Sequence, residues 1–154
     1  MLTDAEKRRI DEVRAMYETA TAACVEALRI VQDVRGWVSD DTLRDLAGYL
    51  DLSPAYLESL ATFYSMIFRR PVGRHVIMVC DSVCCWMDGS EDLIAALGER
   101  LGAGLGDTSE DGRFTLLPVV CLGACDQAPA MLIDWHLHGN VETDDLDQIL
   151  ALYP

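Results

Sequence analysis

Two short apolar runs in the second half of the chain each lead directly into a loop that carries paired cysteines. Both runs, 75–79 and 114–120, are rich in β-branched and aliphatic residues, which is typical of buried strands. Loops that follow strands in α/β domains meet at one edge of the sheet, so these two loops are expected to converge. The cysteines in them are Cys80, Cys84, Cys85, Cys121 and Cys125.

Four thiolates from two converging loops can hold one tetrahedral zinc ion or one 2Fe–2S cluster. Four residues separate Cys80 from Cys85, and three separate Cys121 from Cys125. Structural zinc usually takes tighter gaps, whereas a binuclear cluster holds its terminal ligands further apart. The second half also has enough apolar sequence to fold without a zinc staple. The spacing therefore favours an iron–sulfur cluster, and a zinc-stabilised interaction module is the alternative from a different functional class.

The adjacent Cys84 and Cys85 leave the first loop ambiguous, because either thiol can partner Cys80 while their side chains point in different directions. No two cysteines have the Cys-x-x-Cys spacing of thiol–disulfide enzymes, which argues against that chemistry. Cys24 lies on a segment of helical apolar spacing and is expected to be an ordinary core residue. Trp86, directly after Cys85, is expected to shield the site from water.

Other cofactor motifs are missing from the sequence. Gly102 and Gly104 are followed by Asp107 rather than by a third glycine, and they do not lie between a strand and a helix. We therefore expect the chain to bind no NAD or FMN itself. His136 and His138 share one face of a short strand without an obvious third ligand, so they are expected to be ordinary sheet histidines.

Negative charge is concentrated in the second half of the chain. Residues 1–70 carry 12 acidic and 9 basic side chains, whereas residues 71–154 carry 14 and 3. Such a surface repels phosphate backbones, so no nucleic acid is expected as a partner. The first residues are charged and lack the apolar segment of a signal peptide, and no run approaches the roughly 18 apolar residues of a membrane span. We expect a cytoplasmic protein without direct membrane insertion, in which six cysteines indicate metal or redox chemistry rather than disulfides.

The first half has the apolar periodicity of four short helices, which implies a small bundle. Gly36 is typical of a helix C-terminus, and Ser53 followed by Pro54 is typical of a helix start. Ser39, among other candidates, can cap the third helix, and Phe63 on the fourth is expected in the core. The expected helices span residues 4–18, 21–34, 42–50 and 55–68.

The pattern breaks at residues 69–74, where a proline, a glycine and three arginines interrupt it. We therefore expect a helical bundle domain over residues 1–70 and an α/β domain over residues 71–154. The overall class is α/β (α+β), with the helical bundle first.

The second half is expected to follow the order β-α-β-β-α. Pro118 indicates either an edge position or a bulge for the second strand, and a tight turn is expected near Asp134. Ser90 and Thr143 are the candidate caps of the two helices. The expected strands are 75–79, 114–120, 130–133 and 135–138, and the expected helices are 88–101 and 144–152.

Seven short motifs, taken together, resemble one known family. They are Gly36-Trp37-Val38, Ala61-Thr62-Phe63-Tyr64-Ser65, Pro71-Val72-Gly73-Arg74-His75, Cys80-Asp81-Ser82-Val83-x-Cys85, Asp111-Gly112-Arg113-Phe114-Thr115-Leu116-Leu117-Pro118, Cys121-Leu122-Gly123-x-Cys125-Asp126 and Met131-x-Ile133-Asp134. The resemblance is to the E subunits of bacterial NADH–quinone oxidoreductase (respiratory complex I), thioredoxin-like 2Fe–2S ferredoxins, and it spans about residues 20–150.

This resemblance implies a helical N-terminal part followed by a thioredoxin-like domain with one 2Fe–2S cluster. The family pattern C-x₄-C … C-x₃-C assigns Cys80, Cys85, Cys121 and Cys125 as the iron ligands. It leaves Cys84 as a spare thiol, which departs from the family pattern.

The resemblance also implies an electron-transfer role in NADH dehydrogenase, with no substrate site on this chain. The cluster would exchange single electrons with the FMN of the F subunit, which binds NADH, and the large iron–sulfur G subunit would be a further partner. The complex is membrane-bound, with this chain on its cytoplasmic side. Related subunits serve NAD-dependent formate dehydrogenases and hydrogenases, which are alternative hosts. The motifs 115–118 and 121–126 favour the respiratory enzyme.

Overall fold

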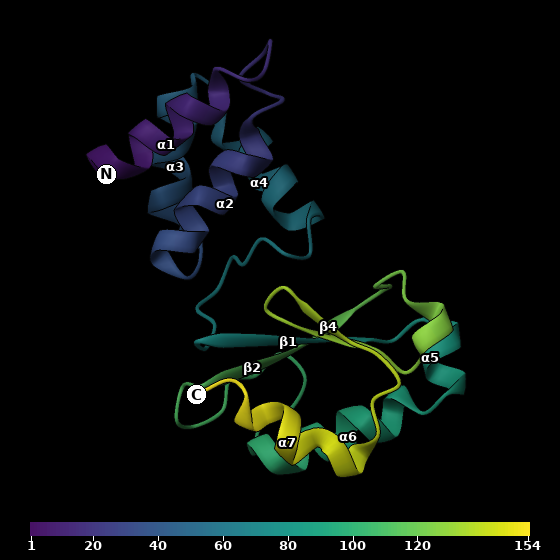
Figure 1. Cartoon of the computed structure of the whole chain (residues 1–154). Helices are drawn as coiled ribbons and strands as arrows, with labels where there is room; N and C mark the ends of the chain where they lie inside the picture. Colours follow the sequence, from purple (N-terminus) through teal and green to yellow (C-terminus); the bar gives the residue numbers. More distant parts are fainter. The chain divides into compact units, whose positions relative to one another are not determined.

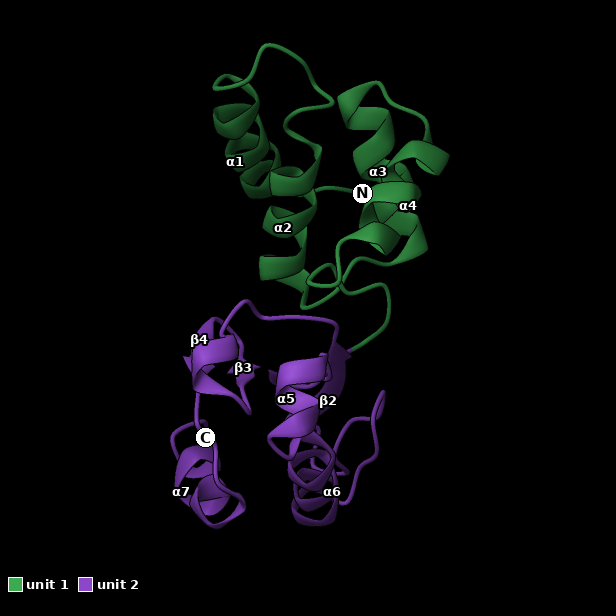
Figure 2. Ribbon diagram, turned by 90° about the vertical axis from the view of Figure 1, so that its right-hand side faces the viewer, with its two compact units in different colours: residues 1–71 green, residues 72–154 purple.

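The computed structural model describes residues 1–154, which divide into two compact units, Met1–Pro71 and Val72–Pro154 (Figure 1, Figure 2). Seven α-helices accompany one mixed four-stranded sheet, which confirms the expected α/β (α+β) class. None of the helices is long and apolar enough to cross a membrane.

The first unit packs four helices around one apolar core. The helices are α1 (Asp4–Arg14), α2 (Cys24–Arg35), α3 (Asp40–Leu50) and α4 (Pro54–Phe63). The largest fully buried side chains of this core are Ile10, Leu28, Leu46, Leu50 and Leu57. Cys24 is buried among them, as predicted, and this burial raises the pKa of its thiol.

Three helix ends follow from local sequence. The Ser39 hydroxyl accepts a hydrogen bond from an N–H group in the first turn of α3, and Ser53 does the same for α4, which starts with Pro54. α2 ends at Gly36, whose φ of 80° lies in the left-handed region that glycine adopts without strain. These boundaries confirm the predictions made for them.

Two helices of the first unit end several residues earlier than their apolar periodicity predicted. α1 ends at Arg14 rather than at residue 18, and Met16 is exposed. α4 ends at Phe63, and the predicted core position of Phe63 is wrong, because its side chain is 78% exposed. Its ring meets that of Tyr64 edge-on, with centroids 5.3 Å apart.

The buried side chain of Gln32 explains why α4 stops early. Its Nε2 donates to the carbonyl of Met66 at 2.9 Å, and its Oε1 accepts from the N–H of Phe68 at 2.6 Å. The N–H of Val38 donates to the carbonyl of Phe68 at 2.8 Å. This segment therefore pairs its backbone with α2 and with the link after α2, instead of continuing the helix.

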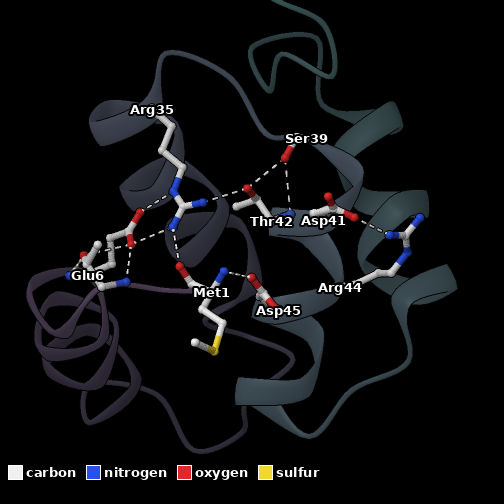
Figure 3. A network of polar contacts seen from close by, with 9 residues as sticks. Met1, Glu6, Arg35, Ser39, Asp41, Thr42, Arg44 and Asp45 are labelled. Atoms are coloured by element: carbon white, nitrogen blue, oxygen red, sulfur yellow. Dashed lines mark hydrogen bonds and ion pairs between the residues drawn. The ribbon is translucent and has the colours of Figure 1, made fainter.

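A polar network joins the start of the first unit to α2 and α3 (Figure 3). The guanidinium of Arg35 donates to both carboxylate oxygens of Glu6, at 2.6 and 2.9 Å. It also donates to the hydroxyl of Thr42 at 2.9 Å and to the carbonyl of Met1 at 3.1 Å. Glu6 is fully buried and accepts the N–H of Thr3 in a capping box. The bond from Arg35 lowers the pKa of Glu6 from 4.5 to about 2.

The second unit is a sheet in the order β2-β1-β3-β4, in which β1 and β2 are parallel and the other pairs are antiparallel. Its elements are β1 (His75–Cys80), α5 (Val83–Met87), α6 (Ser90–Leu101), β2 (Phe114–Val119), β3 (Met131–Ile133), β4 (His136–His138) and α7 (Leu146–Ala151). β2 is an edge strand, which is one of the two positions that Pro118 predicted. Proline has no backbone N–H, and on the open side of an edge strand no hydrogen bond to a neighbouring strand is lost.

Helices α6 and α7 cover one face of this sheet (Figure 1). Alternate residues of β1 point into the core between the sheet and the helices, and Ile77 and Val79 are fully buried there. The helices contribute Leu93, Leu97 and Leu146 to the same core.

Two predicted helix starts are wrong. The short helix α5 was not predicted, and Gly89, with a φ of 94°, occupies the N-cap position of α6. Ser90 lies buried inside that first turn, because the chain needs a left-handed residue to pass from α5 into α6. Thr143 does not cap α7 but begins a 3₁₀ turn, Thr143–Asp145, that precedes it.

The three histidines of the chain gather around Tyr153, near the C-terminus. Nε2 of His138 lies 2.8 Å from the Tyr153 hydroxyl, and the rings of His75 and His136 have centroids 5.5 and 6.3 Å from that of Tyr153. His75 also contacts the carboxylate of Asp134 at 2.8 Å. These contacts fasten the chain end to the sheet.

Candidate metal centre

The parallel pairing of β1 and β2 brings the two cysteine loops to the same edge of the sheet. Cys80, the last residue of β1, lies opposite Val119, which is two residues before Cys121. The N–H of Asp81 donates to the carbonyl of Val119 at 3.1 Å, so the pairing continues into the loops. The predicted convergence therefore follows from strand direction and register.

All five cysteines of the two loops lie at this edge, including the four predicted ligands. The thiols of Cys80 and Cys85 are close enough to influence each other's ionisation. The thiol of Cys125 is likewise influenced by those of Cys84 and Cys121. The first pair is buried, Cys84 is half-buried, and Cys121 and Cys125 are exposed. Cys84, which the family pattern leaves spare, is thus inside the group.

The thiols differ in how easily they ionise. Burial, followed by the neighbouring Cys80 thiol, raises the pKa of Cys85 to about 11. The neighbouring Cys84 thiol raises the pKa of the Cys125 thiol. Binding of a metal or cluster requires thiolates, so assembly at this site releases protons.

Backbone N–H groups lie near the sulfurs. Burial opposes ionisation of Cys80, but the N–H groups of Ser82 and Leu122 and the Cys85 thiol together outweigh it and lower the pKa of this thiol. The N–H of Gly123 donates to Sγ of Cys121 at 3.3 Å. Such donors stabilise thiolates, and they are the outer contacts that iron–sulfur centres use.

The donor set fits a 2Fe–2S cluster. It consists of thiols alone, and these fall into two neighbouring sets, Cys80 with Cys85 and Cys125 with Cys84 and Cys121. Two groups of thiols match a centre in which each of two irons takes two protein ligands.

Exposed apolar side chains flank the cysteines, which the sequence reasoning did not foresee. We call Val83, Trp86, Met87 and Val120 the apolar rim. Trp86, expected to shield the site, is itself 56% exposed. Asp81, Asp88 and Asp126 are exposed beside the rim. Apolar residues interspersed among ligands in two loops were the signal for this surface.

Comparison with known proteins agrees with this geometry. The family model of the thioredoxin-like [2Fe-2S] ferredoxin matches residues 10–154. The E subunit of NADH-quinone oxidoreductase from Pseudomonas aeruginosa is 47% identical over 153 residues, covering 99% of this chain and 92% of that protein. The same subunit of Escherichia coli K12 is 45% identical over 152 residues, with the same coverage.

A solved structure extends the similarity to another complex. The chain aligns with an NAD⁺-reducing [NiFe]-hydrogenase in the H₂-reduced state, with a TM-score of 0.71 and 27% identity. The alignment covers 90% of this chain and 24% of that chain, so this chain corresponds to about a quarter of it. Together these matches confirm the resemblance found in the motifs: the chain belongs to the thioredoxin-like [2Fe-2S] ferredoxin family, among the E subunits of NADH–quinone oxidoreductase.

Proposed function

We propose that this chain is the electron-transfer subunit of an NADH–quinone oxidoreductase and carries one 2Fe–2S cluster on Cys80, Cys85, Cys121 and Cys125. The observation that carries the proposal is the gathering of these thiols by two parallel-strand loops in a member of this family. The proposed domains are a helical bundle over residues 1–70 and the cluster domain over residues 71–154.

Bound at this site, a 2Fe–2S cluster supplies one-electron chemistry without a proton or hydride. The buried Cys80 and Cys85 would hold it from the side of the sheet, and the exposed Cys121 and Cys125 would hold its outer side. Electron transfer between proteins depends on the separation of the centres. The exposed side is therefore where an electron donor can approach.

The proposed donor is the FMN of the F subunit, which oxidises NADH, and the large iron–sulfur G subunit is a further neighbour. We propose that this chain binds neither NAD nor FMN, and that it works on the cytoplasmic side of the membrane complex. Similarity to the E subunits and to an NAD⁺-reducing hydrogenase supports partners that handle NADH. The hydrogenase similarity keeps the equivalent subunit of an NAD-linked hydrogenase as the second candidate.

Purification of the chain under anaerobic conditions tests the cluster. We expect a coloured protein that bleaches with dithionite and then gives the EPR signal of one unpaired electron per chain. Two irons and two sulfides per chain should accompany it. A colourless, EPR-silent protein with one zinc per chain would instead support the zinc-stabilised interaction module.

The apolar rim offers a docking surface for the flavin-bearing partner, because its exposed residues are sequence neighbours of Cys84, Cys85 and Cys121. We expect Val120→Asp to weaken binding of that partner about tenfold or more, since a charge would be buried at the interface. Leu152→Asp is the matched control, because Leu152 is similarly exposed on the second unit but lies after α7, away from the cysteines. Titration calorimetry with both variants, at equal iron content, measures the effect. Equal affinities would place the docking surface elsewhere.

A further inference from the structure

The last cysteine of the second loop, Cys125, lies in a segment that is fastened to the chain just beyond β4. Cys125 begins a short 3₁₀ turn, Cys125–Gln127. The N–H of Asn140 donates to the carbonyl of Gln127 at 2.7 Å, and the N–H of Val141 donates to the carbonyl of Pro129 at 3.1 Å. Two backbone hydrogen bonds therefore hold the residues that directly follow this cysteine.

These bonds bring two backbones very close together, and Gly139 permits the approach. A Cβ at Gly139 would lie 2.5 Å from the Cβ of Gln127 and 3.1 Å from its carbonyl oxygen, whereas an ordinary contact is 3.4 Å or more. The φ of Gly139 is not positive, so its backbone conformation is open to other residues. Space alone therefore requires glycine at this position. Gly123 is the opposite case, because its φ is 74° and a Cβ there would meet nothing within 4 Å.

A Cβ added at Gly139 would displace the cysteine side of this contact. The chain beyond β4 is anchored, because Val141 is only 5% exposed and packs in the core of the second unit. The residues of the turn Cys125–Gln127 are all exposed, so no packing resists a push. Widening the contact from 2.5 to 3.4 Å moves the turn by about 0.9 Å. Ligand distances at metal sites hold to within about 0.2 Å, so such a shift is large for a ligand.

We infer that Gly139 is a positioning residue for the centre: without a Cβ, it lets the chain beyond β4 hold Cys125 where this thiol can bind iron. The exposed Cys125 takes no position from the core, unlike the buried Cys80. The N–H of Cys80 donates to the carbonyl of Ala130 at 3.1 Å, so the same segment is tied to the first cysteine loop at its other end. The placement of these two thiols then depends on one glycine outside both loops. The part of the inference that concerns iron rests on the proposed function.

Gly139→Ala tests this role through retention of the cluster. After anaerobic reconstitution, the variant should release iron to a chelator about tenfold or more faster than the wild type, and the EPR line shape of its remaining cluster should differ. Gly73→Ala is the matched control, because its Cβ would lie 2.9 Å from the carbonyl oxygen of Arg113. That clash is comparable, but it lies before the first residues of β1 and β2, at the end of the sheet opposite the cysteines. Equal iron release by the two variants would overturn the inference.

Removing the side chain of Gln127 relieves the clash from the other side. Gln127→Gly combined with Gly139→Ala eliminates the Cβ and Oε1 atoms that the alanine would meet at 2.5 and 2.7 Å. The double variant should therefore retain iron longer than Gly139→Ala alone. Gln127→Gly by itself measures the effect of the added loop freedom, so the four proteins form a double-mutant cycle. Absence of rescue would contradict the inference.

Amide exchange tests the contact without the cluster. In the metal-free full-length chain, the Asn140 amide should exchange about tenfold or more slowly than an unstructured peptide, because it donates to Gln127. Gly139→Ala should remove this protection and Gly73→Ala should keep it. An unprotected Asn140 amide in the wild type, or unchanged protection in Gly139→Ala, would overturn the positioning role. A protected amide in a chain that gives no EPR signal would contradict the proposed function and leave the positioning of Cys125 standing.

Discussion

A Cys85→Ala chain is expected to lose its iron–sulfur cluster, whereas a Cys84→Ala chain is expected to retain it. Cys85 is buried, as is Cys80, while the family pattern leaves Cys84 spare. Loss of one of four terminal thiolates leaves an iron one ligand short, which should abolish stable assembly. Iron and sulfide per chain, visible absorption and EPR after anaerobic reconstitution measure the outcome.

The two variants control for each other, because each replaces one cysteine with alanine at neighbouring positions of α5. Thermal unfolding of the metal-free proteins shows whether either change disturbs the fold. Cys84 requires this test because its thiol lies near that of Cys125. Loss of cluster with Cys84→Ala but not with Cys85→Ala would reassign the ligand. Retention in both would show that the two thiols replace each other.

A Glu6→Gln chain is expected to lose about 3 kcal/mol of unfolding free energy at neutral pH. The Glu6 carboxylate is fully buried and receives two hydrogen bonds from Arg35. Glutamine preserves the shape of the side chain but carries no charge. The Arg35 guanidinium is then left without a counter-charge, and removing one partner of a buried ion pair is strongly destabilising. Urea unfolding of the full-length chain, followed by circular dichroism, measures the loss.

The pH dependence of this loss has a definite sign. The folded pKa of Glu6, about 2, lies below its ordinary value of 4.5, so the folded state binds fewer protons in this range. The stabilisation is therefore complete above pH 4.5 and disappears as the pH falls toward 2. The difference between wild type and Glu6→Gln should shrink over the same interval.

The exposed pair of Asp41 and Arg44, which belongs to the same region, provides the control (Figure 3). Asp41→Asn should change the unfolding free energy by less than about 1 kcal/mol, because water screens such pairs. If Glu6→Gln costs no more than Asp41→Asn at neutral pH, the buried pair does not stabilise the first unit.

Much of the fold could be predicted because it depends on local signals. Ser39, Gly36 and Ser53 mark helix ends through hydrogen bonds and φ angles that involve only neighbouring residues. The apolar runs before Cys80 and Cys121 indicate strands through composition alone. Their parallel pairing follows from the general rule that a strand, a crossover helix and a second strand lie parallel in one sheet.

The failed prediction for the end of α4 involves residues far apart in the sequence. Apolar periodicity continues past Phe63, but Gln32 on α2 takes up the backbone of the following segment. No residue near Phe63 in the sequence indicates that these hydrogen bonds to Gln32 will replace the helical ones. The failed prediction for the start of α6 is local: Ser90 has the chemistry of a cap, but the unpredicted α5 just before it requires a left-handed residue at Gly89.

The sequence by itself determined the elements of this protein, the two cysteine loops and, through its motifs, the family. Only the tertiary structure decided which thiols lie together. The bond from the Asp81 N–H to the Val119 carbonyl and the proximity of Cys84 to Cys125 both join segments that are distant in the chain. They depend on the register of β1 against β2 and on the placement of α5, and helical or strand periodicity carries no information about either.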